Sequence, residues 1–395
     1  MPCVQLAART ERELFVQKNR REVNEFEGVS DAIEVLKIVH KPRSYDELVT
    51  WIPHPTPVDE LYQGLTDFER NQLAEHAESL IGSERNEEAE EICLCLAAFC
   101  DARLDNCLRR FVSHQSLWPS LAFHRSPPDV RDELLARVEV DEDNRNHILL
   151  ALAWIGDSTV IDRFGLWRND PPSWCDSLYV PPEDYSREAG WELTSDGKRR
   201  NLYFSQCHAL RRGPSQSPDS FRAINGRTDK CPWCSANLTS IVEVDPAFFA
   251  QSLISEWRFP IRVATCEVCT AFAESIFGII SDDGQANWSS KNVRPKYLPD
   301  DSESWGRLPE DTLYLSEVRS AIHAASQFLP TAFSQLGGHP TWVQDSVYPN
   351  CPECSESMMF LAQIANEDIE DHSEGTYYAF LCPRCKTTAT AYQQT

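Results

Sequence analysis

Residues 231–238 read CPWCSANL and residues 351–358 read CPECSESM, so a Cys-x-x-Cys pair recurs in a similar context 120 residues later. Downstream of each, a second pair follows a strand-like run, in VATCEVC at 263–269 and in AFLCPRC at 379–385. One Cys-x-x-Cys turn supplies two thiols, and two turns supply the four soft ligands of a tetrahedral zinc ion. The spacing therefore predicts two zinc sites, formed by Cys231, Cys234, Cys266 and Cys269 and by Cys351, Cys354, Cys382 and Cys385.

Four thiolates leave no open coordination position for water, so both zinc ions are expected to be structural and not catalytic. Corresponding pairs are offset by 120 and 116 residues, which predicts an internal duplication with one zinc ribbon in each half. The loops between paired turns, 235–265 and 355–381, are longer than those of a compact ribbon. Two other interpretations stay open: redox dithiols of the thioredoxin type, or cysteine pairs combined into cross-paired or single sites.

The N-terminal part of the chain has the periodicity of α-helices. Between residues 58 and 170, apolar residues recur at spacings of three and four in short segments with short connections. This pattern predicts a HEAT-like stack of paired helices, which is a form of α-solenoid. Gly156 and Asp157 are expected to form a turn between two helices, as a C-cap and an N-cap.

The rest of the chain is expected to be mixed. Strands are predicted at 238–244, 261–265 and 377–381, and a helix at 311–329, where Leu315, Val318, Ile322, Ala325 and Leu329 share one side. A Pro/Ser-rich stretch at 213–220 marks a boundary. We therefore predict a multidomain α+β protein with a helical lead-in at 1–57, a HEAT-like helical domain at 58–170, an irregular or β linker region at 171–224 and a β-rich zinc-binding domain at 225–395.

The chain is strongly acidic, with 61 acidic and 37 basic residues and a net charge of −24. Residues 51–100 are the most acidic stretch, with 11 acids and 2 bases. Such a surface repels phosphate backbones and speeds encounter with basic partners. One acidic cluster at an expected helix start is either solvated surface or a contact for a partner; it comprises Glu87, Glu88, Glu90 and Glu91.

No secretory signal is evident, because the first 15 residues lack a basic segment followed by an apolar one. No apolar run reaches the roughly 18 residues that span a bilayer. We therefore expect a cytoplasmic protein, where thiols stay reduced and 15 cysteines favour metal binding over disulfides. The sequence has no phosphate-binding loop, nucleophile elbow or His-Glu-x-x-His motif, so we predict that the protein is not an enzyme.

The sequence SQLGGHPTWVQ at 334–344, followed by YPNCPEC at 348–354 and MFLAQ at 359–363, resembles the YwqG-like family of bacterial proteins. The resemblance covers roughly residues 225–395 and implies a duplicated α+β domain. It brings no activity with it, although some members look like immunity proteins encoded beside secreted toxins. In this motif the Gly337-Gly338 pair is expected to form a tight turn, and Trp342 and Gln344 are candidates for contact with a partner.

Taken together, these features predict an acidic interaction protein stabilised by two zinc ions. The expected role is that of an immunity protein that binds and blocks a bacterial toxin acting in the cytoplasm, such as a basic nuclease. The alternative is a zinc-ribbon protein that binds nucleic acid through a basic patch before the first zinc site. The residues of that patch are Arg211, Arg212, Arg222, Arg227 and Lys230.

Overall fold

The computed structural model describes residues 12, 15–213, 220–249, 259–298, 309, 313–370 and 373–394. The chain forms two compact units, Met1–Pro119 and Ser120–Thr395. This division differs from the predicted domains, because it lies inside the helical stretch 58–170 and none lies near residue 225. The predicted helices are therefore shared between the two units.

The first unit is mainly helical, and its most buried helix is α5, which packs against α2, α3 and α4. The described part of the predicted lead-in at 1–57 contains helical residues 15–19, helix α2, and two short strands that pair in parallel. In chain order the elements are β1 (Arg21–Val23), α2 (Ala32–His40), β2 (Val49–Trp51), α3 (Val58–Gln63), α4 (Asp67–Leu80), α5 (Asn86–Cys100) and α6 (Asp105–Ser113).

Local capping explains where α4 begins. The Thr66 hydroxyl accepts the Glu69 backbone N–H, and the Glu69 carboxylate accepts the Thr66 backbone N–H, which completes a capping box. The buried side of the helix consists of Leu73, Ala77 and Leu80, at the spacing that the periodicity predicts.

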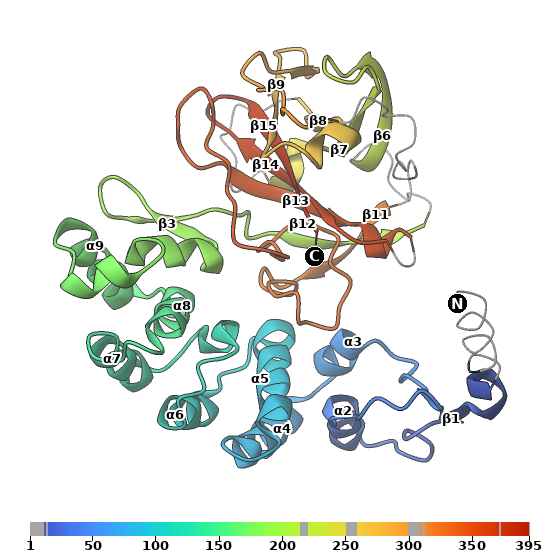
Figure 1. The fold of residues 1–395 in the computed structure, drawn as a ribbon, viewed down its shortest axis with the longest axis vertical. Helices are drawn as coiled ribbons and strands as arrows, with labels where there is room; N and C mark the ends of the chain where they lie inside the picture. Colours follow the sequence, from blue (N-terminus) through green and yellow to red (C-terminus); the bar gives the residue numbers. More distant parts are fainter. Residues whose placement is uncertain are drawn as a thin grey trace, which may run out of the picture. The chain divides into compact units, whose positions relative to one another are not determined.

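The second unit begins with the remaining helices, which are coloured green in Figure 1. The predicted turn between α8 and α9 is confirmed: Gly156 has a left-handed backbone and its N–H donates to Leu152, while the Asp157 side chain caps α9 at Val160. That these helices form a HEAT-like solenoid stays a prediction. The elements are η1 (Ser120–Phe123), α7 (Pro128–Arg137), α8 (Arg145–Ile155), α9 (Ser158–Asn169), η2 (Ser173–Ser177) and η3 (Pro182–Ala189).

Residues 171–224, predicted as a linker region, are an integral part of the second unit. The Trp191 ring is fully buried, stacks on Phe164, and its Nε1 donates to the Ala153 carbonyl at 2.8 Å. The strands in this region are β3 (Trp191–Leu193), β4 (Arg199–Asn201) and β5 (Cys207–Arg212). Because β5 lies inside the main sheet, no boundary separates it from the strands that follow.

The centre of the second unit is an eight-stranded antiparallel sheet in the order β10-β9-β15-β14-β13-β12-β5-β11. The strands β13, β14 and β15, in red in Figure 1, form its middle. The remaining bounds are β9 (Ile276–Ile280), β10 (Ala286–Trp288), β11 (Leu313–Arg319), β12 (Gln335–Gly337), β13 (Met359–Ala365), β14 (Thr376–Cys382) and β15 (Thr387–Gln393), with the short η5 at Asn366–Asp368.

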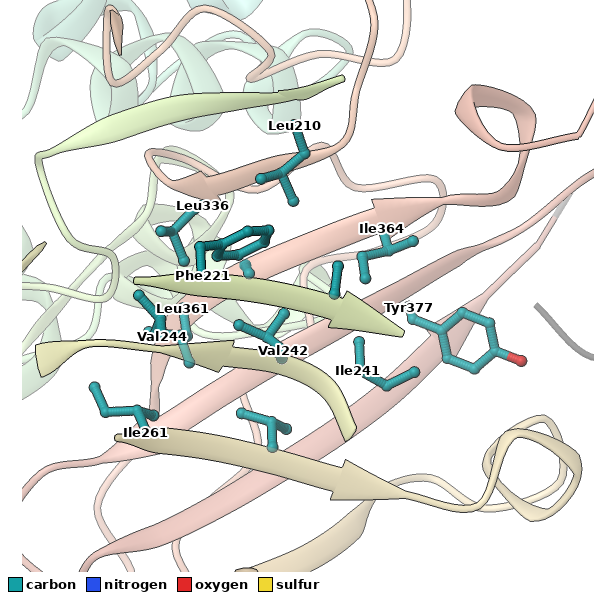
Figure 2. Packing of buried hydrophobic residues seen from close by; sticks show 14 of the residues in the cluster. Leu210, Phe221, Ile241, Val242, Val244, Ile261, Leu336, Leu361, Ile364 and Tyr377 are labelled. Atoms are coloured by element: carbon teal, nitrogen blue, oxygen red, sulfur yellow. The ribbon is translucent and has the colours of Figure 1, made fainter. Parts of the chain in front are cut away.

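A second, three-stranded antiparallel sheet has the order β6-β7-β8, with β6 (Phe221–Lys230), β7 (Asn237–Val244) and β8 (Ile261–Thr265), and η4 (Pro246–Phe249) follows β7. Figure 2 shows its inner side chains, such as Ile241 and Ile261, directed toward those of the large sheet, such as Leu361 and Ile364. Burial of this apolar layer holds the two sheets together. The predicted strands at 238–244, 261–265 and 377–381 are therefore confirmed as β7, β8 and β14.

The helix predicted at 311–329 is wrong. The described residues of this segment form strand β11 and then a series of turns. The register with β5 shifts between Leu315 and Val318, so a bulge produces an apolar spacing of three that resembles a helix period. Pairing with a strand about a hundred residues earlier overrides that local pattern.

Among the described residues, no helix combines the length and the apolar character that crossing a bilayer requires.

Candidate metal centres

The first cysteine site joins the end of the β6–β7 hairpin to the end of β8. Cys231 and Cys234 lie in the turn between β6 and β7, Cys266 is the N-cap of the single-turn helix α10 (Glu267–Thr270), and Cys269 lies within that helix. The Sγ atoms of Cys231 and Cys269 are 3.7 Å apart, and those of Cys234 and Cys266 are 3.5 Å apart. Two turns far apart in sequence thus bring four sulfurs together.

The second cysteine site is built into the large sheet. Cys382 is the last residue of β14, and Cys385 lies in the turn that leads to β15. Cys351 and Cys354 precede β13, and the Sγ atom of Cys354 is 3.8 Å from that of Cys382. The predicted grouping of the eight cysteines into these two sets is confirmed, so the cross-paired alternative is not what the structure forms.

The first turn of each site has the same backbone conformation. Ser235 and Ser355 follow the second cysteine of the turn with φ values of 63° and 62°. Their N–H groups donate to the carbonyls of Cys231 and Cys351, at 3.0 and 2.8 Å. This likeness fits the predicted duplication at the level of the turn, although the sheets around the two sites differ.

The sulfur positions suit a tetrahedral metal ion. In each site the four Sγ atoms lie within 4.8 Å of one another. A tetrahedron with metal–sulfur bonds of about 2.3 Å has edges of about 3.8 Å. The Sγ–Sγ distances of 3.5, 3.7 and 3.8 Å given above are close to this value. Each group could therefore hold one metal ion, and a set of four thiolates is the ligand set typical of structural zinc.

The two sites differ in what surrounds them. Three of the four cysteines of the first site are buried, in a small cluster of their own with Leu238, Val268 and Ile276. In the second site only Cys351 and Cys382 are buried, but both belong to a large aromatic cluster that contains Phe360 and Phe380. The first site is thus more enclosed, and the second is more closely connected to the main core.

A cation accompanies the exposed side of the second site. The Arg384 guanidinium lies beside Cys354 and Cys385 and donates to the Glu356 carboxylate at 2.9 Å. Burial opposes ionisation of Cys354, but hydrogen bonds from the Glu356 backbone and from Arg384 outweigh it and lower the thiol pKa to about 7. This environment therefore favours the thiolate that metal binding requires.

Among known proteins, the chain is similar to one that is described as uncharacterized. The sequence is 48% identical over 400 residues to the uncharacterized protein YpfL of Salmonella typhimurium, and the match covers all of this chain and 93% of that protein. It belongs to the YpfL family. No family model and no solved structure matches the chain. The resemblance to the YwqG-like family therefore stays a prediction, and membership of the YpfL family carries no assigned activity.

In this YpfL-family chain, the four predicted acidic contacts do not form one surface. Glu88 is buried, where Arg85 donates to its carboxylate at 2.7 Å. Glu90 is half-buried and accepts hydrogen bonds from Asn86 and Ser116. The interpretation of Glu88 as a partner contact is therefore wrong, because its carboxylate is occupied inside the unit.

The other two members of that acidic cluster reach the surface. Glu87 and Glu91 are both exposed, at the start of α5. The Glu91 carboxylate lies 3.1 Å from Nδ1 of His40, whose Nε2 lies 2.8 Å from the Tyr62 hydroxyl. Glu87 thus remains a candidate for contact with a partner, whereas Glu91 also supports the packing between α2, α3 and α5.

Trp342 is a core residue and not a contact for a partner. Its ring is buried and lies 4.9 Å from that of Tyr378 and 5.1 Å from that of Tyr348. Gln344 is exposed, but its side-chain amide donates to the Gln394 carbonyl at 2.9 Å, next to the end of β15. The sequence could not distinguish an exposed tryptophan from a buried one, because both occur beside turns.

The predicted tight turn at Gly337 and Gly338 is a bend at the end of a strand. Gly337 is the last residue of β12 and Gly338 lies in the bend that follows, and the N–H groups of Gly338 and His339 donate to the Phe204 and Ala321 carbonyls. Both glycines have positive φ, and a Cβ on Gly337 would lie 1.8 Å from the Gln206 carbonyl oxygen. The Gln363 side-chain amide holds the segment after this bend, because its oxygen accepts the Thr341 N–H and its nitrogen donates to the Phe333 carbonyl. This role of Gln363 could not be predicted from the sequence, because nothing near Gln363 in the chain indicates its partners.

Cys207 and His208 are neighbours on β5 whose residue types could supply a nucleophile and its base, but the structure keeps the two side chains apart. Successive residues of a strand point to opposite faces, and here Cys207 is buried beside Gln335 while His208 faces Phe248 and the Ser316 carbonyl. Burial raises the pKa of Cys207 to about 12, so the thiol stays protonated.

Proposed function

We propose that each cysteine site binds one structural zinc ion. The observation that supports this proposal is that the four sulfurs of each site lie within 4.8 Å of one another, and that the separations of 3.5, 3.7 and 3.8 Å given above are close to the edge of a tetrahedral zinc–thiolate centre. Each ion would join elements that are distant in sequence, β6–β7 to β8 in the first site and the chain before β13 to β14 in the second. The thiolates of the chain supply the ligands, and the apolar clusters around them limit access of water.

Elemental analysis of the purified chain tests the zinc proposal. We expect two zinc ions per chain, one in a Cys231→Ser or Cys351→Ser variant, and none in the double variant. Replacement of Cys175, which is half-buried and far from both sites in sequence, should leave the zinc content unchanged. A full-length, folded protein that binds no zinc would contradict the proposal.

We propose further that the protein functions by binding a basic protein partner through acidic helical surface in the first unit. Helices α4 and α5 and the turn between them carry carboxylates that have no ion pair within the described part of the chain: Glu75, Glu78, Glu84 and Glu87. Uncompensated carboxylates on a rigid helix pair attract basic surfaces and speed association with them.

A nuclease is the class of partner that this surface suits best, because a nuclease must present basic surface to a phosphate backbone. Binding over that surface would exclude nucleic acid from the enzyme. The role of an immunity protein against a nuclease toxin follows from this charge complementarity, and it is part of the proposal.

The test combines identification and reconstitution. A toxin-like nuclease encoded beside the gene would be purified and mixed with the zinc-loaded chain, and we expect nuclease activity to fall in proportion to complex formed. Reversal of the four carboxylates to lysine should weaken the complex at least about a hundredfold, as expected when several charge pairs become like-charge contacts.

A matched variant controls for net charge. The control variant reverses four exposed acids of the second unit to lysine, namely Asp345, Glu353, Glu367 and Glu370. It changes the net charge of the chain by the same amount and should leave the affinity for the nuclease within about threefold of the parent. Equal weakening by both variants, or full binding by the first, would contradict the assignment of the surface.

A further inference from the structure

The first cysteine site presents aromatic surface that the second site lacks. The rings of Trp233 and Trp288 meet edge to face with centroids 5.0 Å apart, and both pack against the cysteine cluster while remaining partly exposed. Trp233 lies inside the Cys-x-x-Cys turn, where the second site has the exposed Glu353. One turn therefore carries an indole at the position where its counterpart carries a carboxylate.

A loop after β10 is fixed beside these tryptophans at both of its ends. The Asn292 side chain accepts the Phe277 N–H at 2.7 Å and donates to the Phe277 carbonyl at 2.8 Å. At the other end, Leu298 packs against the first cysteine cluster. The exposed side chains between and beside these anchors are held near the tryptophans, and they are Lys291, Val293, Arg294, Lys296 and Tyr297.

The loop is basic in a chain that is otherwise acidic. Residues 286–298 contain three basic residues and no acid. Lys230, at the end of β6 and directly before Cys231, is also exposed. In the described part of the chain these four cations form no ion pair.

The acids nearby are few among the described residues. Asp229 is paired with Arg227 at 2.8 Å, and Glu267 is buried and hydrogen-bonded to Thr239. Glu274 is exposed. Three further acids follow the loop in the sequence but lie outside the described residues: Asp300, Asp301 and Glu303.

The basic patch predicted from the sequence is not the same surface. Arg211 is paired with Glu317 at 2.7 Å, and Arg227 with Asp229. Of that patch only Lys230 also belongs to the group around the tryptophans. The unpaired basic surface therefore lies beside the first cysteine site itself, and not along the strands before it as the sequence predicted.

We propose that this basic aromatic face binds a short segment of single-stranded nucleic acid; it comprises Trp233, Trp288, Tyr297, Lys230, Lys291, Arg294 and Lys296. Unpaired bases stack on aromatic rings while lysine and arginine neutralise the phosphates. An acidic peptide would satisfy the cations, but a single strand of nucleic acid also presents a flat base beside every phosphate, which suits the indoles and the phenol. The proposal goes beyond the protein-binding function and uses none of the carboxylates of α4 and α5.

The acidity of the whole chain determines how binding is measured. At very low salt the net charge of −24 repels a nucleic acid over a long range, and at about 0.1 M salt the screening length falls to about 10 Å. Local cations then dominate the interaction. Affinity is therefore measured at about 0.1 M salt and above, where it should fall with a log–log slope of about −3 if four phosphates are neutralised.

The experiment uses the full, zinc-loaded chain and fluorescently labelled single strands of about 12 nucleotides, a length within the range that one binding surface covers. Fluorescence anisotropy gives the affinity. Trp233→Glu, which copies the residue of the second site, should weaken binding at least about tenfold by removing one stacking surface. The triple variant Lys291→Ala, Arg294→Ala, Lys296→Ala should weaken it similarly and reduce the salt slope by about 2.

Two controls keep the result specific. A triple alanine variant at the exposed Lys18, Arg103 and Lys198 should bind within about twofold of the parent, and all variants should retain their zinc. Polyglutamate should compete at least about tenfold less well than the unlabelled strand. The proposal is overturned if the parent shows no binding up to about 100 µM, if Trp233→Glu binds as the parent does, or if polyglutamate competes equally.

Discussion

The two cysteine sites have the same four ligands and the same turn geometry, but they differ in how far they are buried and in how closely they are connected to the core. The first is nearly enclosed, yet it belongs to a small cluster at the edge of the three-stranded sheet. The second is open on one side, yet two of its cysteines belong to the aromatic core of the eight-stranded sheet. Exposure of the ligands and connection to the core are thus separate properties. We expect exposure to control the rate at which each site loses its metal, and connection to the core to control how much the free energy of unfolding falls when the metal is lost.

The largest expected difference concerns stability. Cys382→Ser should lower the free energy of unfolding by about 5 kcal/mol, because it removes a metal ligand at the end of a central strand. Cys269→Ser should cost about 2 kcal/mol, because the cluster that it disturbs is small. Urea unfolding in zinc-buffered solution measures both, with Cys175→Ser as the reference. Equal losses would show that connection to the core does not matter.

The next difference concerns metal loss. A chelator with a coloured zinc complex should remove the two ions in two phases that differ about tenfold in rate, with the second site first, because Cys354 and Cys385 are partly exposed. The single-site variants Cys231→Ser and Cys351→Ser assign each phase. If the faster phase belonged to the first site, exposure of the ligands would not be the controlling property.

A smaller effect is expected from the cation beside the second site. Arg384→Ala should speed zinc release from that site about threefold, because the guanidinium stabilises the Cys354 thiolate, and it should leave the first site unchanged. Lys386→Ala removes a charge from the same turn, where the ammonium pairs with Asp282 instead of the sulfurs, and serves as the control. A similar change in both variants would point to net charge alone.

The smallest effect tests what the sites have in common. Ser235 and Ser355 both adopt the left-handed conformation, which costs a residue with a side chain about 1 kcal/mol more than glycine. Since glycine loses more backbone entropy on folding, Ser235→Gly and Ser355→Gly should each stabilise the chain by only about 0.5 kcal/mol. Thermal unfolding compares them, and unequal shifts would show that the two turns are not equivalent.

The grouping of the cysteines could be predicted from the sequence because each pair of ligands lies within four residues. A Cys-x-x-Cys motif can therefore be recognised without knowledge of the fold. The same holds for the turn at Gly156 and Asp157 and for the strands β7, β8 and β14. Local signals also reveal where α4 and α5 begin, because their first turns carry acids.

The sequence was misleading where distant partners decide the outcome. Strand β11 owes its conformation to β5, and Glu88 owes its burial to the way in which α5 packs on α4. From the sequence, Trp342 resembles a surface residue beside a turn. In the structure its ring packs against Tyr378 of strand β14 and is buried. The basic aromatic face was missed for the same reason, since Trp233 and Trp288 lie 55 residues apart in the sequence.

The position of β15 has a consequence for biosynthesis. This strand, at residues 387–393, lies between β14 and β9, and β9 ends more than a hundred residues earlier at Ile280. During translation, one edge of β9 therefore stays unpaired until the ribosome has passed residue 390. Unpaired strand edges promote aggregation. Because this contact spans so much of the chain, the closing of the sheet should be a slow, late step that chaperones can protect.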